Sequence, residues 1–301
     1  MAEKQLFVVF GATGAQGSSV VKALLKDGTF KVRGVTRNPC KKAANDLKEL
    51  GAEIVTGDLD DAESVKSVLT GAYGVFLVTN FLEHFSKERE IKQGKLVADT
   101  SKSLGLKHVV FSGLDNVKKL TNGELEVPHY DSKGEVEEYF REIDVPMTSV
   151  RLPAYFENLL THTKPQKAPD GDGYTIAIPM EDVPVRCMSV ADLGPMVLSI
   201  LKSQEQYIGK NINLHTDEVT TEEMATILSK HTGKKIRDAK ISIEDYEKQN
   251  SAKYKAMANM FRFFKIKSDY NKELTWKLNP KSRTFDEWVK KNTDMLTAIL
   301  S

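Results

Sequence analysis

Residues 8–28 read VVFGATGAQGSSVVKALLKDG, and this stretch decides the fold class. A run of β-branched and aromatic residues ends at Gly11. Gly14 and Gly17 follow, and an amphipathic segment begins directly after them. Glycines at this spacing let the backbone turn tightly and approach a pyrophosphate, and the helix that starts there offers unpaired N–H groups and a positive dipole. The stretch predicts a strand, a phosphate-binding turn and a helix; a plain tight turn is the alternative.

The first half of the chain alternates strand-like runs with segments of helical periodicity. The runs cover residues 6–10, 31–36, 53–56, 74–78, 108–112 and 147–150. Strands separated by helices pair in parallel, and several of these runs carry few polar residues, as expected when helices cover both faces of the sheet. The predicted fold class is α/β, a Rossmann-type doubly wound parallel sheet.

The pattern changes in the second half, which has fewer strand-like runs. Two helices are predicted there by capping boxes, at Thr220 with Glu223 and at Thr284 with Glu287. Residues 210–215, KNINLH, form one of the short strand candidates. We expect an NADP-binding Rossmann domain over residues 1–151 and a smaller C-terminal α/β lobe over residues 152–301. Residues 183–202 are expected to return to the Rossmann domain.

Composition limits the classes of partner. The 301 residues carry 43 Lys and Arg against 42 Asp and Glu, a net charge of +1, so no bulk charge attracts nucleic acid or an anionic membrane. Cys40 and Cys187 stand far apart and predict neither a disulfide framework nor a metal site. No apolar window approaches membrane-spanning length. We expect a cytoplasmic protein, with the nucleus as a second compartment, and no direct contact with nucleic acid or membrane.

Arg37 occupies the position that selects the cofactor. Many NAD-binding proteins carry an acid about 20 residues after the glycine motif, which binds the ribose 2′-hydroxyl. Here the residue 20 positions after Gly17 is Arg37, with Lys41 and Lys42 nearby. A guanidinium suits a 2′-phosphate and cannot accept from a hydroxyl, so the sequence predicts NADP(H). A solvated surface arginine is the alternative.

Polar residues follow the third and fourth strand-like runs. Asp58 is placed either to accept a hydrogen bond from an adenine amino group or to cap the next helix. Thr79 and Asn80 come where the chain passes the nicotinamide half of the crevice, because ligands of such sheets lie beyond the carboxyl ends of the strands.

With VVFGATGAQG, VTRNP, GDLDD and VRLPAYFENLL in place, the sequence resembles the NmrA-like family of atypical short-chain dehydrogenases over almost its whole length. The resemblance implies a Rossmann-type domain with a smaller C-terminal lobe. It also implies NADP(H) contacts from the glycine turn, three strand ends, two helices and the lobe junction: Gly11, Ala12, Thr13, Gly14, Ala15, Gln16, Arg37, Asn38, Lys41, Asp58, Leu59, Thr79, Asn80, Phe81, Lys92, Lys133, Tyr155, Phe156, Glu157 and Asn158.

Catalytic short-chain dehydrogenases pair a Tyr with a Lys four residues later on one helix. In residues 129–140, HYDSKGEVEEYF, the residue four before Lys133 is His129, and Tyr130 is only three before. A slip of one residue rotates the phenol by about 100° around the helix, so the dyad is out of register. Three alternatives remain: Lys133 only holds the ribose, His129 is the proton donor, or Tyr130 reaches the site with Ser112 as a polar helper.

Three functions follow from these patterns. The first is an NADP(H)-binding redox sensor with no or weak activity, which changes conformation or assembly with its cofactor. The resemblance extends to an animal NADPH sensor and implies a homodimer and a protein partner, either argininosuccinate synthase or a transcription-regulatory protein. The second is an NADPH-dependent reductase of a small carbonyl or quinone compound. The third is a transcription-related module that binds protein and not DNA.

Overall fold

The main sheet of the molecule is parallel throughout. The computed structural model describes residues 3–248, 252–267 and 269–300, and within them seven strands pair in the order β11-β6-β5-β4-β1-β2-β3. Their bounds are β1 (Leu6–Val9), β2 (Lys31–Thr36), β3 (Glu53–Thr56), β4 (Gly74–Leu77), β5 (His108–Gly113), β6 (Met147–Arg151) and β11 (Asn211–Asn213). The predicted α/β doubly wound fold is confirmed, and the six expected strands of the first half are all present.

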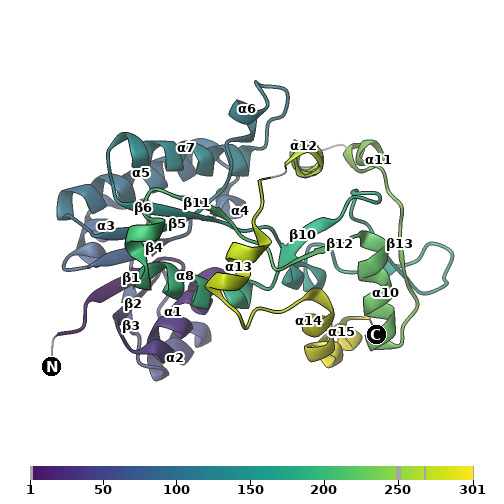
Figure 1. The fold of residues 1–301 in the computed structure, drawn as a ribbon, viewed down its shortest axis with the longest axis horizontal. Helices are drawn as coiled ribbons and strands as arrows, with labels where there is room; N and C mark the ends of the chain where they lie inside the picture. The colour runs from purple at the N-terminus through teal and green to yellow at the C-terminus, as the bar shows by residue number, and fades with distance from the viewer. Residues whose placement is uncertain (1–2, 249–251, 268, 301) are drawn as a thin grey trace.

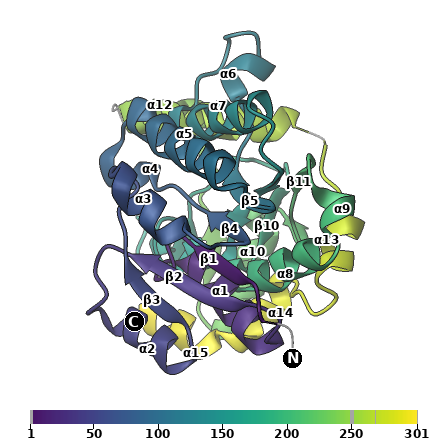
Figure 2. The same ribbon diagram turned by 90° about the vertical axis from the view of Figure 1, so that its left-hand side faces the viewer.

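Helices cover both faces of this sheet (Figures 1 and 2). One face carries α3 (Ala62–Leu69), α5 (Lys87–Leu104) and α7 (Pro128–Glu142); the other carries α1 (Ala15–Asp27), α2 (Lys42–Glu49) and α8 (Leu193–Lys202). Three helices of four residues complete this part: α4 (Phe81–His84), α6 (Val117–Leu120) and α9 (Gln204–Tyr207). The two layers of helix explain why β4 and β5 are buried along their whole length.

The second lobe contains two small sheets, ordered β12-β10-β7 and β13-β9-β8, and lies to the right in Figure 1. Its strands are β7 (Ala154–Tyr155), β8 (Gln166–Lys167), β9 (Tyr174–Ile176), β10 (Val185–Met188), β12 (Asp217–Val219) and β13 (Ile236–Asp238). Its helical segments are η1 (Phe156–Leu160), α10 (Thr221–Thr232), α11 (Ile243–Glu247), α12 (Ala252–Ile266), α14 (Phe285–Lys291) and α15 (Thr293–Ile299). The segments η2 (Val190–Asp192) and α13 (Lys272–Leu278) pack against the core of the main sheet beside α1 and α8. Both predicted capping boxes are present, at the start of α10 and of α14.

The chain crosses between the lobes more than once. The candidate strand at residues 210–215 is β11, which pairs with β6 and so extends the main sheet. Helix α8, within the expected returning segment, packs on α1: the hydroxyl of Ser19 donates to the carbonyl of Ala191 over 2.8 Å and accepts from the N–H of Gly194 over 2.9 Å. Strand β10 stays in the second lobe. Among the described residues, no helix has both the length and the apolar character needed to cross a membrane.

Candidate functional site

The glycine turn between β1 and α1 is built without room for side chains. Gly11 has a φ of +62°, a conformation that residues with a Cβ rarely adopt. A Cβ on Gly17 would lie 2.2 Å from the carbonyl oxygen of Gly11, and one on Gly14 would lie 3.3 Å from the same atom. The turn therefore packs directly against the start of α1, and backbone N–H groups face the space above it.

The first turn of α1 offers those N–H groups to a ligand. Its N-cap is Gly14, which has no side chain to accept from them, and the first turn carries no acid. Gln16 donates from Nε2 to the phenol oxygen of Tyr155 over 2.8 Å, while its buried Oε1 has no hydrogen-bond partner. The N–H groups fit an anionic ligand such as a dinucleotide pyrophosphate, whereas the Gln16 Oε1 atom can only accept from a donor such as a ribose hydroxyl.

Arg37 extends from the end of β2 and meets an acid. Its guanidinium forms a two-point ion pair with Glu83 of α4, with 2.9 Å between Nη2 and Oε2. On the loop that follows, the side-chain oxygen of Asn38 accepts from the N–H of Cys40 over 3.0 Å, and Lys41 is exposed at the N-cap of α2. Three of the predicted cofactor-binding residues, Arg37, Asn38 and Lys41, thus share one loop.

Asp58 follows β3 and does not cap the next helix. The cap of α3 is Asp61, whose carboxylate accepts from the N–H groups of Glu63 and Ser64. Asp58 instead accepts from the N–H of Asp60 over 3.0 Å. The capping alternative for Asp58 is therefore wrong, and its half-buried carboxylate remains available for an adenine amino group.

Beyond the glycine turn, Lys133 of α7 lies in a buried polar cluster. Its Nζ donates to the carbonyl and hydroxyl oxygens of Thr79, over 3.1 and 2.5 Å, and to Oε1 of Glu90 over 2.8 Å. Glu90 of α5 is fully buried, and it also accepts from the hydroxyl of Ser132. The ammonium has three N–H groups and three acceptors, so a ribose hydroxyl that accepts from Lys133 must replace or share one of them.

The charge on Glu90 depends on this cluster. Burial by itself raises the pKa of the Glu90 carboxyl, but the Lys133 ammonium and the hydrogen bonds from Lys133, Ser132 and Thr79 outweigh burial and lower that pKa below 4.5. Glu90 is thus an ionised acceptor at neutral pH, and it fixes where the Lys133 side chain lies.

His129 lies one helical turn before Lys133, against the ring of Phe81 at 5.8 Å between centroids. Burial, with a further contribution from the Lys133 ammonium, lowers the pKa of His129 to about 4. The imidazole is therefore neutral near pH 7, and such a group is a weak fit for a general acid.

Tyr130 faces away from the Lys133 cluster. Its ring packs edge-on against Phe263 and Phe264 of α12, with centroids 6.3 and 6.1 Å apart, and burial raises the pKa of its phenol. The one-residue slip seen in the sequence thus points the phenol toward the second lobe. Ser112, the suggested helper, is buried at the end of β5.

The lobe junction contains four more predicted residues, which differ in placement. Tyr155 contacts the glycine turn through Gln16, and burial raises the pKa of its phenol to about 12. The Phe156 ring packs in the core of the second lobe against Phe285, because η1 turns it inward, so its side chain does not face the glycine turn.

The structure also places the remaining residues that were predicted to contact the cofactor, two at the lobe junction and three elsewhere. Glu157 accepts from the hydroxyl of Ser189 and the N–H of Val190, and Asn158 is half-buried in η1. Leu59 is half-buried after β3 and Asn80 is exposed at the N-cap of α4. Lys92 is exposed on α5, two residues from the buried Glu90 and so on the opposite side of the helix; its role stays a prediction.

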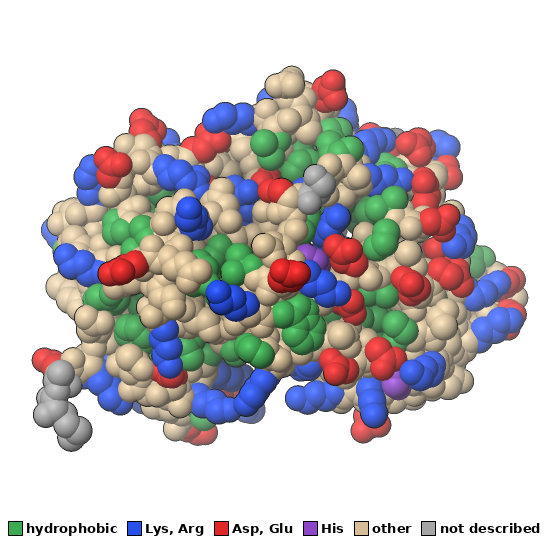
Figure 3. All heavy atoms as spheres, viewed as in Figure 1, with side chains coloured by type: hydrophobic (Ala, Val, Ile, Leu, Met, Phe, Trp, Pro, Cys, Tyr) green, Lys and Arg blue, Asp and Glu red, His purple; other side chains and the backbone are tan. Residues whose placement is uncertain are grey.

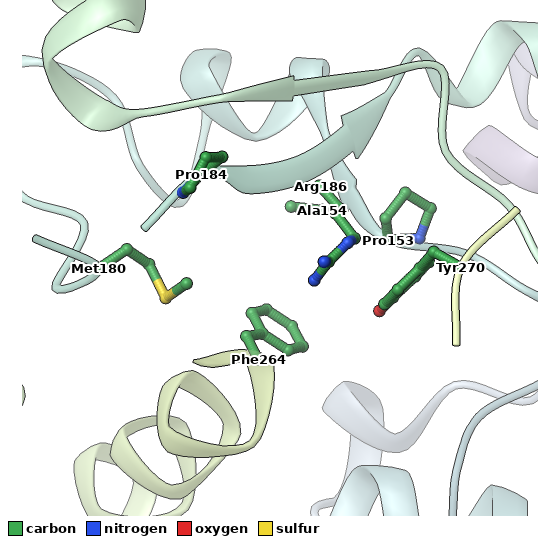
Figure 4. A pocket seen from close by; sticks show the side chains of 7 residues that line it. All are labelled: Pro153, Ala154, Met180, Pro184, Arg186, Phe264 and Tyr270. Atoms are coloured by element: carbon green, nitrogen blue, oxygen red, sulfur yellow. The ribbon is translucent and has the colours of Figure 1, made fainter. Parts of the chain in front are cut away.

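A small cavity lies in the second lobe beside α12 (Figure 4). Pro153, Ala154, Met180, Pro184, Arg186, Phe264 and Tyr270 line it. Arg186 stacks on Tyr270, with 4.5 Å from the guanidinium carbon to the ring centroid, and Phe264 of α12 closes one side. The space open to the centre of a water-sized sphere is about 10 Å³, roughly that of one water molecule.

Sequence analysis missed Glu83 and Glu90, although a signal for Glu90 was present. The buried residues of α5 are Glu90, Gln93, Gly94, Val97, Ala98 and Ser101. Glu90 lies on this same face at helical spacing. A charged residue among positions that face the core is unusual, and this was the signal for Glu90. Glu83 belongs to a helix of four residues, too short for periodicity to show which way it faces.

Known proteins resemble this chain along most of its length. The model of the NmrA-like family matches residues 3–289. An NmrA-like family domain-containing protein of Dictyostelium discoideum is 32% identical over 300 residues, which are 97% of this chain and 98% of that protein. An NmrA-like family domain-containing oxidoreductase of Malbranchea aurantiaca is 34% identical over 251 residues, covering 78% of this chain and 75% of its own length.

Solved structures agree with the fold. Crystal structures of NmrA, described as a negative transcriptional regulator, superpose with a TM-score of 0.82 at 20% identity and cover 99% of this chain and 98% of theirs. One of them is a complex with NAD and another a complex with NADP. At this identity the likeness concerns the arrangement of the sheet and lobes.

Proposed function

The chain belongs to the NmrA-like family, and on this premise we propose that it is an NADP(H)-binding redox sensor, a regulator whose cofactor state selects between conformations or assemblies. One observation carries the proposal. The glycine turn and the start of α1 fit a dinucleotide, while the phenol of Tyr130 packs on α12 and not beside Lys133. Binding is supported, and the proton path of a dehydrogenase is not.

The residues assigned to the cofactor have separate tasks. The first-turn N–H groups of α1 bind the pyrophosphate, Arg37 and Lys41 bind the 2′-phosphate, and Lys133 orients the ribose at the nicotinamide end. When bound, the cofactor supplies hydride exchange at its nicotinamide ring. The NAD and NADP complexes of NmrA, which has the same fold, support a dinucleotide as the ligand.

A route from cofactor to surface runs through Tyr155. The Gln16–Tyr155 hydrogen bond joins the glycine turn to the second lobe across 139 residues of sequence. A ligand that moves Gln16 changes a contact between the lobes. A switch of this kind requires that the cofactor bind the two conformations with different affinity.

The test combines binding with molar mass. Titration calorimetry measures the Kd for NADP⁺ and NADPH, and light scattering on a sizing column measures mass without ligand and with saturating amounts of each. We expect binding of both and a mass that changes with ligand. We expect an Arg37→Met variant to bind NADP⁺ weakly. In the presence of NADP⁺ its molar mass should therefore stay that of the ligand-free protein. Absence of binding, or binding that alters neither mass nor amide exchange, would contradict the proposal.

A second candidate is an NADPH-dependent reductase of a small carbonyl or quinone compound. The oxidoreductase name of the Malbranchea aurantiaca relative favours it, as does the presence of Lys133 with His129 one turn away. The position of Tyr130 opposes it, because the phenol packs against α12 and not beside Lys133. Oxidation of NADPH in a screen of such compounds, lost in Lys133→Ala while NADPH still binds, would establish it.

We propose protein partners for the sensor. A homodimer is the first, and argininosuccinate synthase and a transcription-regulatory protein are the heterologous candidates. Nucleic acid is disfavoured: the net charge is +1, and acidic and basic side chains are interspersed on the face seen in Figure 3. We place the protein in the cytoplasm, with the nucleus as a second compartment; a fluorescent fusion and co-purification with each candidate test these assignments.

A further inference from the structure

The Arg37–Glu83 pair lies where the 2′ substituent of a dinucleotide is read. Arg37 is 20 residues after Gly17, at the end of β2, and Glu83 comes from α4, just after β4. Both Nη atoms of Arg37 contact the Glu83 carboxylate, one of them at 2.9 Å. The guanidinium edge that would take a phosphate is therefore already paired with an acid of this chain.

The pair spans the sheet edge above the glycine turn. In the main sheet β1 lies between β2 and β4, so the ends of β2 and β4 are roughly 10 Å apart, with the glycine turn between them. The backbone of α4 holds Glu83 in place: its N–H donates to the carbonyl of Asn80 over 3.2 Å, and the N–H of Phe85 donates to the carbonyl of Phe81 over 2.8 Å.

A ligand can reach both members of the pair. The side chain of Arg37 is 56% exposed and that of Glu83 is 36% exposed. Ion pairs this exposed are weak, so an incoming 2′-phosphate can displace the carboxylate. The hydrogen bond from Arg37 lowers the pKa of Glu83, which is therefore ionised at neutral pH and acts only as an acceptor.

The two side chains therefore suit two different ligands at one position. A 2′-phosphate needs the Arg37 fork and is repelled by Glu83. A ribose 2′-hydroxyl needs an acceptor, and Glu83 supplies the carboxylate that β2 itself lacks. We infer that Glu83 is a specificity-determining residue: it competes with the 2′-phosphate for Arg37 and accepts from the 2′-hydroxyl, so that the site binds NAD(H) as well as NADP(H). This inference rests on the proposed function.

The test measures the Kd of NADP⁺ and of NAD⁺ by titration calorimetry for the full chain and for Glu83→Gln. The amide keeps the size of the side chain and removes the charge. We expect the Kd of NADP⁺ to fall about two- to fivefold, the range for an exposed ion pair. The Kd of NAD⁺ should rise about tenfold, because the charged acceptor of the 2′-hydroxyl becomes a neutral amide oxygen, which forms a weaker hydrogen bond. The preference for NADP⁺ over NAD⁺ then grows in the variant.

Glu88→Gln is the matched control. Glu88 is an exposed acid at the start of α5 whose carboxylate accepts from the hydroxyl of Ser86 over 3.1 Å. Its loss changes the net charge equally, and both Kd values should stay within about twofold of the unmodified chain. Thermal unfolding followed by circular dichroism verifies that both variants are folded.

The outcomes are distinct. If the unmodified chain binds neither dinucleotide, the proposed function fails and this inference fails with it. If the chain binds NADP⁺ but the NADP⁺/NAD⁺ preference is the same in Glu83→Gln, only the inference is overturned. An equal change of preference in Glu88→Gln also overturns it, since the effect would then be one of net charge.

Discussion

Gly17 shows how one residue couples the turn to the helix. The 2.2 Å approach that a Cβ would make is to backbone, the carbonyl oxygen of Gly11, and the same Cβ would lie 2.9 Å from the Cα of Ala12. Neither atom can rotate away as the end of a flexible side chain could. The close contact between β1 and α1 thus depends on the absence of a single methyl group.

We predict that Gly17→Ala destabilises the protein by about 1–3 kcal/mol, as overpacking does, and abolishes NADP⁺ binding, because the turn must open. Urea unfolding and calorimetric titration measure the two effects. Gly209→Ala is the comparison: Gly209 has a φ of +81° but open space around its Cβ position, so it strains the backbone and leaves binding intact. Normal NADP⁺ affinity in Gly17→Ala would refute the role of the turn.

Glu90 and Lys133 are coupled through burial. The carboxylate of Glu90 is fully buried, and the Lys133 ammonium is the charge that balances it. A buried carboxylate whose partner is removed keeps its desolvation cost and loses its compensation. The pair is therefore a structural requirement as well as part of the candidate site.

We predict that Lys133→Met lowers the free energy of unfolding by about 3–5 kcal/mol at neutral pH. The loss should shrink on acidification. In the unmodified chain the lowered pKa of Glu90 gives stability that is present above about 4.5 and lost as pH falls through the folded value. In the variant the Lys133 charge and its hydrogen bond are gone. We expect burial to outweigh the remaining hydrogen bonds from Ser132 and Thr79 and to raise that pKa, so stability falls as pH rises through it. Urea unfolding between about pH 5 and about pH 7.5 tests this: over this range Glu90 adds no slope in the unmodified chain, whereas stability falls with rising pH in the variant.

Lys92→Met is the matched control for this prediction, because Lys92 is exposed on α5. Its stability should remain within about 0.5 kcal/mol of the unmodified chain. If the gap between Lys133→Met and the unmodified chain did not narrow at low pH, Glu90 would not be the group responsible.

At the scale of elements, α12 is held onto the Rossmann domain by one face. Phe263 is 3% exposed and contacts Tyr130, and Asn259 donates to the carbonyl of Glu126 over 3.1 Å. Beyond the helix, Lys267 pairs with Asp115 over 2.6 Å. These contacts hold α12 on the Rossmann domain, and Phe264 of the same helix forms part of the wall of the small cavity.

We predict that Phe263→Ala raises amide exchange in residues 254–267 and 117–127 and leaves β1, β4 and β5 protected. Removing a buried phenyl ring costs about 3–5 kcal/mol, enough to open a peripheral element locally. Hydrogen exchange followed by mass spectrometry measures this pattern, with Ile266→Ala, at an exposed position of the same helix, as the control. Uniform loss of protection across the main sheet would contradict a local role.

At the scale of the whole molecule, the second half of the chain completes the first domain. Strand β11 pairs with β6, and α8 covers α1 so closely that a Cβ on Gly194 would lie 2.1 Å from the carbonyl oxygen of Ser19. Leu193, Met196, Val197 and Ile200 of α8 belong to the same core as Val20, Val21 and Leu24 of α1. The residues before position 151 therefore do not form a complete folding unit without α8 and β11.

We predict that a fragment of residues 1–151 does not fold cooperatively, because it exposes the apolar face of α1 and one edge of β6. Near-ultraviolet circular dichroism and urea unfolding should show no sharp transition, while the full chain gives one. A fragment that unfolds cooperatively and binds NADP⁺ would show that α8 and β11 are dispensable.

The sequence by itself determined the elements whose signals are local. The glycine turn and both capping boxes depend on sterics and hydrogen bonds among residues a few positions apart. The six strands of the first half pair with distant residues, but local runs of β-branched and aromatic residues marked them, and all of these elements are present. The shift of Tyr130 relative to Lys133 was also visible, since helical spacing is fixed.

Only the tertiary structure decided the pairs that form the site. Lys133 meets Glu90 across 43 residues of sequence, and Arg37 meets Glu83 across 46. Strand β11 looked like part of the second lobe and joined the first sheet, because an open edge beside β6 satisfies its backbone groups. Each of these pairs joins residues that are distant in sequence and meet only in the folded chain. A pattern among neighbouring residues therefore cannot predict them.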